Sequence, residues 1–153
     1  MVKVEIFELP EDLYYTEEHE WARVEEGKKV RVGLTDFAQK LAGEIIYVDL
    51  PDEGTKVERM QVVATYESGK WVGKLHAPVS GVIVEVNREL EERPELINED
   101  PYGKGWVIVI EAENLDEEIK KLLHGDKAVE WLKEEIERRR DLVERIKAEY
   151  EEG

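Results

Sequence analysis

The sequence predicts a mainly β protein, an antiparallel β sandwich or barrel, with helices at its C-terminal end. From about residue 20 to residue 111 the chain contains many short runs rich in Val, Ile, Tyr and Trp, and some alternate apolar with polar residues, as half-buried strands do. Turns containing Gly or Pro separate these runs, which is typical of sandwiches and barrels. Beyond residue 125 the apolar residues recur every three, four or seven positions, which indicates an amphipathic helix.

Turn-forming residues set the bounds of the expected strands. Glycine accepts the positive φ of a tight turn, and proline cannot donate to the hydrogen-bond ladder of a sheet. In chain order we expect an optional edge strand or leader at 1–8, a strand ending at 24, strands at 29–34 and 44–50, a strand that opens at 56 and runs to 66, and strands at 71–75, 82–86 and 106–111.

Short helices are expected where capping residues flank an apolar run. Thr35 and Asp36 can cap a helix over 37–41, which Gly43 closes. The acidic stretch 87–101 contains two prolines and is expected to be a loop with one helical turn at most.

The C-terminal part is expected to be helical. A helix at 115–123 ends at Gly125, and Asp126 caps the helix that follows. The apolar seam of this second helix is interrupted at Arg139 and consists of Val129, Leu132, Ile136, Val143, Ile146 and Tyr150.

Composition and charge narrow the range of functions. The chain of 153 residues is long enough for one domain with its own core. Its net charge of −16 repels nucleic acid and anionic membranes, so neither is expected as a partner. The chain has no cysteine, which excludes disulfides and thiolate sites. No apolar run approaches the roughly 20 residues of a membrane span, and residues 1–10 do not resemble a signal peptide, so the cytoplasm is the expected location.

No catalytic or metal centre is expected. The three histidines, His19, His76 and His124, are scattered and form no zinc-binding helix repeat. The sequence contains neither a nucleophile elbow nor a phosphate-binding glycine loop. The many carboxylates are best explained as a solvated acidic surface.

The stretch 63–81 is the most informative part of the chain. β-forming residues flank Ser68-Gly69-Lys70 on both sides, which predicts a tight hairpin with Lys70 on or beside its tip. This lysine is a primary amine on a flexible stem, held clear of the protein body. Such a position suits the attachment of a swinging cofactor, although an isolated Gly-Lys pair also occurs on ordinary surface hairpins.

Glu67 stands three residues before Lys70, and Gly81 stands eleven residues after it. This pattern resembles the lipoyl-attachment hairpin of the H protein of the glycine cleavage system. Four further stretches match that family in order, and the resemblance extends from about residue 13 to about residue 135. They are Tyr15-Thr16 with His19-Glu20-Trp21, residues 32–39, Val48-Asp49-Leu50-Pro51 with Gly54-Thr55, and residues 98–106.

The resemblance implies the hammerhead-type β fold of lipoyl and biotinyl carriers, with a helical C-terminus. A biotin carrier is less expected, because methionines typically flank the lysine in that family. We divide the chain into an H-protein-like lipoyl-carrier domain at 1–125 and a C-terminal amphipathic helix with an extension at 126–153. Typical H proteins end near the start of this helix, so we expect the part from Glu137 onward to dock on a partner copy or complex.

The resemblance also implies a carrier without catalysis of its own. A lipoate ligase or lipoyl transferase is expected to recognise Glu67 and Gly81 and to attach lipoate to Lys70 as N6-lipoyllysine. The arm would then carry an aminomethyl group from glycine decarboxylase to the aminomethyltransferase, and dihydrolipoyl dehydrogenase would reoxidise it. Glu20 matches a family glutamate that helps to receive the amine of the loaded arm in a pocket.

Lys74 departs from the family pattern, which usually has an acidic residue four positions after the modified lysine. A cation there should weaken the binding of a protonated aminomethyl group and suit a neutral or anionic adduct. Gly69 and Trp71 also replace the usual valine and alanine. Two alternatives therefore stay open: an H-like lipoate-binding protein that carries sulfur species for a heterodisulfide-reductase-like complex, and an unmodified interaction scaffold.

Overall fold

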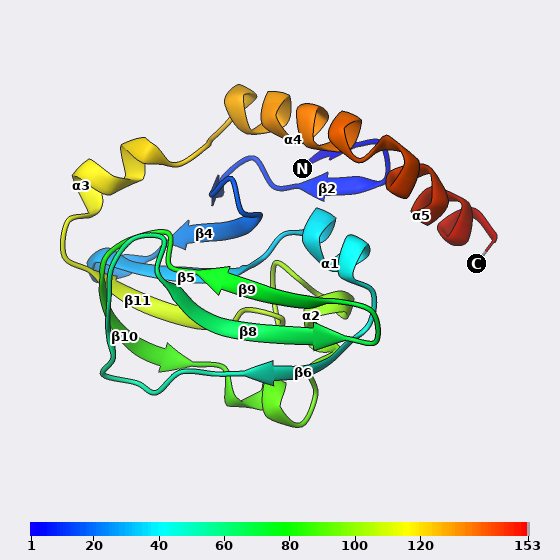
Figure 1. Ribbon diagram of the computed structural model, residues 1–153. Coiled ribbons are helices and arrows are strands. Elements are labelled where there is room, and N and C mark those ends of the chain that lie inside the picture. The colour runs from blue at the N-terminus through cyan, green and yellow to red at the C-terminus, as the bar shows by residue number, and fades with distance from the viewer. Residues whose placement is uncertain (153) are drawn as a thin grey trace.

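The computed structural model describes residues 1–152 as three antiparallel sheets with short helices between the strands and two longer helices at the C-terminal end (Figure 1). The predicted mainly β architecture is confirmed. The strands are β1 (Val2–Val4), β2 (Phe7–Leu9), β3 (Tyr14–Tyr15), β4 (Glu20–Val24), β5 (Lys29–Leu34), β6 (Ile45–Asp49), β7 (Lys56–Val57), β8 (Val62–Ser68), β9 (Val72–His76), β10 (Gly81–Val86) and β11 (Ile108–Ala112). The α-helices are α1 (Asp36–Ala42), α2 (Leu96–Glu99), α3 (Leu115–Glu118), α4 (Asp126–Arg138) and α5 (Arg140–Glu152), with 3-10 turns at Glu26–Lys28, Arg88–Glu91 and Ile119–Lys121.

Two sheets enclose the main core. The larger has the strand order β3-β4-β5-β11-β10-β7, and the smaller has the order β6-β8-β9. Val32, Ile83 and Ile110 from the larger sheet are buried in one apolar cluster with Val48 and Leu75 from the smaller sheet. The inward faces of the two sheets therefore pack on each other as in a β sandwich.

Helix α1 has the predicted caps at Thr35 and Gly43 and extends one residue beyond the predicted range 37–41 at each end. The Thr35 hydroxyl accepts a hydrogen bond from the backbone N–H of Ala38 (3.2 Å), which caps the first turn. Gly43 ends the helix with a φ of +85°, a conformation that glycine adopts without strain. These two residues therefore fix the ends of the helix that connects β5 to β6.

The predicted continuous strand from 56 to 66 is wrong. The structure has β7, which pairs with β10 in the larger sheet, and β8, which belongs to the smaller sheet. Between them Met60 adopts a φ of +68°, and the backbone N–H of Gln61 bonds to the carbonyl of Glu58 (3.0 Å). This turn moves the chain from one sheet to the other.

Four helical predictions need correction. The helix predicted at 115–123 is α3 followed by a 3-10 turn that ends at Lys121, and the single helix predicted after Gly125 is divided into α4 and α5 at Arg139. Gly125, with a φ of +61°, precedes α4, and Asp126 is the first helical residue rather than the cap. The stretch 87–101 contains a 3-10 turn and α2 instead of a single helical turn. Buried Leu90 and Ile97 anchor these two turns on the core, which the acidic composition of the stretch did not indicate.

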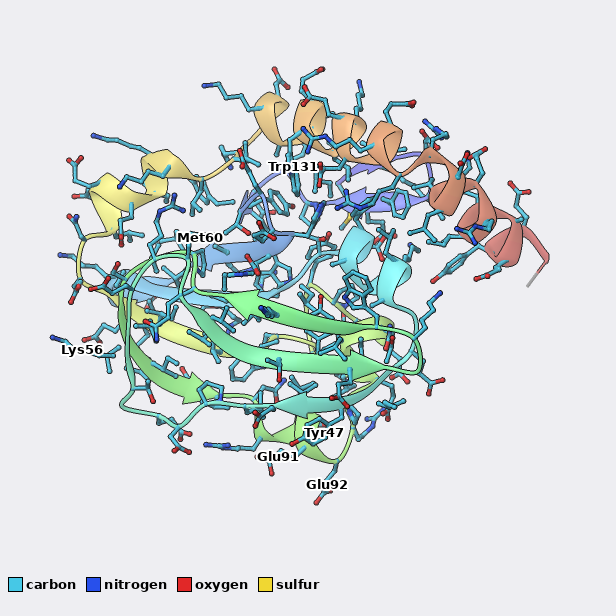
Figure 2. All side chains as sticks on the ribbon, viewed as in Figure 1. Tyr47, Lys56, Met60, Glu91, Glu92 and Trp131 are labelled. Atoms are coloured by element: carbon cyan, nitrogen blue, oxygen red, sulfur yellow. The ribbon has the colours of Figure 1, made fainter. Side chains whose placement is uncertain are left out.

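A second apolar cluster joins the two ends of the chain. It contains Phe7 from β2, Phe37 from α1, Leu132 from α4 and Val143 from α5. Trp131 of α4 packs against this cluster (Figure 2). The N-terminal segment, expected as an optional edge strand or leader, is thus the β1–β2 hairpin on which the C-terminal helices pack (Figure 1). Within residues 1–152, no helix has the length and apolar character needed to cross a membrane.

Helix α5 packs on its own chain, so the expectation that it docks on a partner copy or complex is wrong. Val143 and Ile146 are 0% and 2% exposed. In the turn between β1 and β2, the Glu5 carboxylate pairs with Arg140 (2.8 Å) and Lys147 (3.0 Å). The surface that covers α5 comes from α1 and from the β1–β2 turn, both far from α5 in the sequence of the same chain.

Hydrogen exchange tests this packing. We expect amide protection in α5 that does not change across a protein concentration series, because the same chain covers its apolar side chains. Ile146→Ala should reduce this protection, since loss of a buried isoleucine side chain costs roughly 2–5 kcal/mol, whereas Glu149→Ala on the exposed face should not. Protection that rises with protein concentration would contradict intramolecular packing.

Candidate functional site

Lys70 lies in the turn between β8 and β9, as the sequence predicts. Glu67 and Val72 are the last paired residues before the turn. Ser68 closes the turn by donating its backbone N–H to the carbonyl of Trp71 (2.8 Å). Within residues 1–152 the Lys70 Nζ atom has no hydrogen bond or ion pair, although its backbone N–H reaches Ser68 Oγ (3.4 Å). The turn therefore presents a free amine.

A cleft of about 580 Å³ lies beside the hairpin. Its walls come from α1, the β8–β9 hairpin, the loop before β4 and the junction of α4 and α5. Phe37, Leu41 and Leu142 belong to its apolar lining. Its ionisable lining consists of Glu18, His19, Tyr66, Lys74, His76 and Arg139.

Two glycines beside this cleft make space for neighbouring side chains. A Cβ atom on Gly43 would lie 3.3 Å from Cε of Lys70, so the lysine stem passes over the end of α1 where a side chain is missing. A Cβ atom on Gly73 would lie 2.2 Å from Cζ of Tyr66, so the tyrosine ring occupies that space on β9. Together with the apolar walls, this arrangement fits a long, thin group attached to Lys70 Nζ.

Glu20 is fully buried behind the cleft and is bonded to His76. Its Oε2 atom accepts hydrogen bonds from the backbone N–H (2.8 Å) and the Nδ1 atom (2.7 Å) of His76, and its Oε1 atom accepts one from the Thr16 hydroxyl. An ionised carboxylate only accepts hydrogen bonds, so Nδ1 carries a hydrogen and Nε2 stays unpaired within residues 1–152. His76 thus forms the cleft wall at this point, with Glu20 behind it.

The surroundings shift the protonation of both partners. Burial raises the pKa of Glu20, with hydrogen bonds from His76 and Thr16 acting the other way. The hydrogen bond to Glu20 raises the pKa of His76, with burial and Lys74 acting the other way. In the sequence His76 is only one of three scattered histidines. Its position two residues after Lys74 in a strand, which places both on one face, was the available signal.

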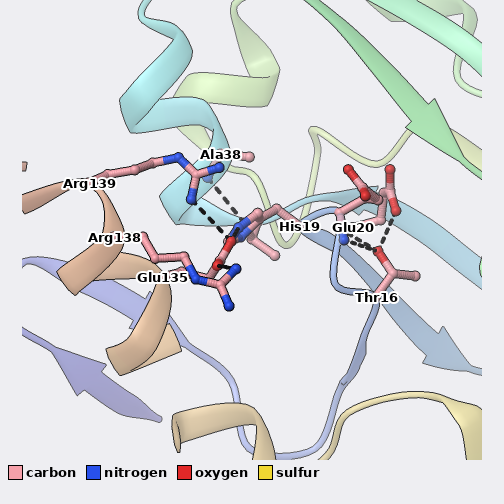
Figure 3. Close-up of polar contacts among 9 residues, drawn as sticks. Thr16, His19, Glu20, Ala38, Glu135, Arg138 and Arg139 are labelled. Atoms are coloured by element: carbon pink, nitrogen blue, oxygen red, sulfur yellow. Dashed lines mark hydrogen bonds and ion pairs between the residues drawn. The ribbon is translucent and has the colours of Figure 1, made fainter. Parts of the chain in front are cut away.

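A second histidine–carboxylate pair joins α4 to the cleft (Figure 3). Glu135 accepts hydrogen bonds from Nε2 of His19 (2.7 Å), from Arg138 (3.0 Å) and from Arg139 (3.2 Å). The His19 ring stacks on Phe37 with 4.6 Å between centroids, and burial lowers its pKa. These contacts hold Arg139, which lies between α4 and α5 where the apolar seam of the single predicted helix is interrupted, against the cleft.

The other two predicted site residues, Glu67 and Gly81, lie outside the cleft, and so does the third histidine. Glu67 is exposed at the end of β8. Gly81 opens β10, where a Cβ atom would lie 2.0 Å from the carbonyl oxygen of Glu111. His124 bonds to the carbonyl of Leu13 (2.9 Å). Folding thus brings His19 and His76 to one cleft and leaves the third histidine elsewhere, and Gly81 has a packing role of its own.

Comparison with known proteins finds relatives along most of the chain. The glycine cleavage H-protein family model matches residues 13–135. A probable glycine cleavage system H protein of Pyrococcus abyssi is 50% identical over 133 residues, covering 87% of this chain and 98% of that protein. The glycine cleavage system H protein of Halalkalibacterium halodurans is 48% identical over 127 residues, covering 83% and 98%. The crystal structure of a glycine cleavage system H protein from Mycobacterium marinum is similar with a TM-score of 0.66 and 37% identity, covering 69% of this chain and 87% of that one.

An NMR titration tests the Glu20–His76 bond. We expect His76 to titrate above the usual histidine pKa of about 6.5, because Glu20 stabilises the protonated ring, and we expect Glu20→Gln to lower this pKa. The raised pKa stabilises the fold fully below the unfolded-state histidine pKa, and this contribution is lost as pH rises through the folded-state pKa of His76. An unchanged His76 pKa in the variant would rule out the bond.

Urea denaturation tests the packing role of Gly81. Gly81→Ala should lower the free energy of unfolding by about 1–3 kcal/mol, the usual cost of overpacking, because the new methyl group meets the backbone of β11. Gly69→Ala is the matched control, since nothing lies within 4 Å of a Cβ atom there. Equal stability of the two variants would leave Gly81 without a packing role.

Proposed function

Because the chain belongs to the glycine cleavage H-protein family, we propose that Lys70 is the lysine to which its lipoate is attached. The protein is a lipoyl carrier of the glycine cleavage system. The observation that supports Lys70 is its place at the tip of the β8–β9 hairpin, with Nζ unpaired in the described part of the chain and the stem beside the cleft. The positions of Glu67 and Gly81 relative to Lys70 also support it.

The turn is suited to modification by an enzyme. Amide formation at Nζ of Lys70 removes a positive charge, and within residues 1–152 no ion pair is lost with it. Glu67 is exposed beside the turn, and we assign to it the recognition of a lipoate ligase or lipoyl transferase through charge complementarity. Gly81 contributes to recognition indirectly in this proposal, by keeping β10 paired closely with β11 at the start of the strand that follows the hairpin.

The cleft is the resting place that we assign to the attached group. Lipoate supplies a dithiolane at the end of a saturated chain, where the aminomethyl group is taken up and released. Phe37, Leu41 and Leu142 offer an apolar wall that matches such a chain and excludes water from it. Glu20 acts on this site through His76, because its own oxygens are already bonded and buried.

A mobile tether lets one carrier serve several enzymes. In this proposal glycine decarboxylase loads the arm, the aminomethyltransferase unloads it and dihydrolipoyl dehydrogenase reoxidises it, while the chain itself contributes no catalysis. A flexible stem keeps the cargo at a high effective concentration near each active site. Trp71 and Val72, which are 57% and 67% exposed, flank Lys70 on the side that an enzyme must approach.

The similarity to glycine cleavage proteins favours this function over the two alternatives. A sulfur-carrying H-like protein and an unmodified scaffold are both compatible with the fold. The relatives and the solved structure described above support neither of them.

Mass spectrometry tests the attachment site. Protein produced with lipoate and a lipoate ligase should gain a single lipoyl group, and peptide mapping should locate it on Lys70. Lys70→Arg should abolish the modification because arginine offers no primary amine, whereas Lys74→Arg should be modified normally. Modification that persists in Lys70→Arg would refute the assignment, and a wild-type protein that stays unmodified would favour the scaffold.

A further inference from the structure

The length of the attached arm decides which residues its sulfur atoms meet. An extended chain advances about 1.2 Å per bond, so the roughly 12 bonds from Lys70 Cα to a lipoyl sulfur span about 14 Å. A strand rises about 3.3 Å per residue, so this distance corresponds to about four residues of β9. An arm lying in the cleft along β9 therefore brings its sulfur atoms to the level of Lys74, two residues before His76.

Cationic side chains line the cleft near Lys74, where the sulfur atoms would lie. The alternating burial of β9 places Lys74 and His76 on one face, and both line the cleft. Glu20 raises the pKa of His76 through the bond to Nδ1. Its own carboxylate is buried and bonded to His76 and Thr16, so it has no surface with which to contact a ligand in the cleft, and its charge is shared with the His76 ring. Arg139 lines the cleft as well, bonded to Glu135.

One further carboxylate acts on His76. Glu18, in the loop before β4, lines the cleft, and its charge also raises the pKa of His76. Glu18 is exposed, so water and salt screen it. Lys74 is exposed as well and is screened in the same way. Lys74 and the protonated ring of His76 are nevertheless two cationic groups side by side on one face of β9, in a chain with a net charge of −16.

We propose that Lys74 and His76 form an anion site that holds a sulfur of the reduced arm as a thiolate, with Glu20 as the positioning residue behind His76. The proposal rests on the attachment of lipoate to Lys70. Thiolates in proteins are stabilised by a neighbouring lysine or protonated histidine. The protonated amine of an aminomethyl group would meet like charges here. The site therefore prefers the arm that has delivered its cargo.

The step is a proton transfer without redox change. The S–H bond of the thiol breaks, its electron pair stays on sulfur, and Nε2 of a neutral His76 takes the proton. When His76 is already protonated, the proton goes to water instead. The imidazolium keeps its Nδ1 bond to Glu20, which stabilises the positive ring. The thiolate is the nucleophilic form, so the site prepares the reduced arm for its next reaction.

The lack of cysteine allows a direct test, because every thiol of the lipoylated, reduced protein belongs to the arm. Protein whose lipoylation at Lys70 has been verified by mass is reduced and desalted. Thiolate absorbance is then followed through a pH titration, with the titration of unlipoylated protein subtracted. We expect roughly tenfold more thiolate than in free dihydrolipoamide at the same pH, in the range where both are mostly protonated.

Substitutions show which residues cause the excess of thiolate. Lys74→Gln and His76→Asn should each remove several-fold of the thiolate excess. Asparagine can donate to Glu20 from the place of Nδ1 but has nothing in the place of Nε2, which keeps the buried carboxylate bonded. Lys56→Gln is the matched control, since it removes the same charge from β7, on the side of the protein away from α5 (Figure 2). It should leave the titration unchanged.

The outcomes separate the two proposals. A thiol that ionises as in free dihydrolipoamide, or an excess that survives both cleft substitutions, would overturn the anion site while lipoylation of Lys70 stands. A wild-type protein that carries no lipoyl group on Lys70 would overturn the proposed function, and the anion site with it.

Discussion

The buried carboxylate of Glu20 is the constraint on which the cleft depends. It belongs to β4 in the larger sheet, and its hydrogen bonds reach His76 at the end of β9 in the smaller sheet. A carboxylate without exposed surface is costly unless its oxygens are bonded, so the two sheets cannot separate here without leaving it unpaired. The same bond decides which nitrogen of His76 remains for a ligand. One interaction thus joins the sheets and prepares the cleft wall.

The position of α4 depends on His19, the residue next to Glu20. His19 precedes Glu20 and bonds to Glu135 of α4, so two adjacent residues hold β9 on one side and α4 on the other. The family match ends at residue 135, and α5 lies beyond it. Buried Val143 keeps α5 on the protein body, and Leu142 becomes part of the cleft. The added helix therefore contributes to the site itself.

Local chemistry explains which parts of the fold could be predicted. The Thr35 cap and the positive φ of Gly43 are requirements of single turns, so residue type signals them. The prediction of one continuous strand from 56 to 66 failed for a different reason. Which sheet a strand joins depends on distant partners, and the left-handed conformation of Met60 is not one that its side chain favours. The prediction that α5 docks on a partner failed for the same reason, because the surface that covers it comes from α1 and the β1–β2 turn, which are distant in sequence.

The sequence by itself determined the family, the hairpin that presents Lys70, and the spacing of Glu67 and Gly81 around it, because turn geometry and motif spacing are local properties. Only the tertiary structure decided what faces an attached arm. Glu20 and His76 lie 56 positions apart, and His19 and Glu135 lie 116 apart. Sheet packing and helix docking bring these pairs together, and burial then makes their hydrogen bonds obligatory. No pattern of neighbouring residues contains that information, so the chemistry of the cleft follows from the fold.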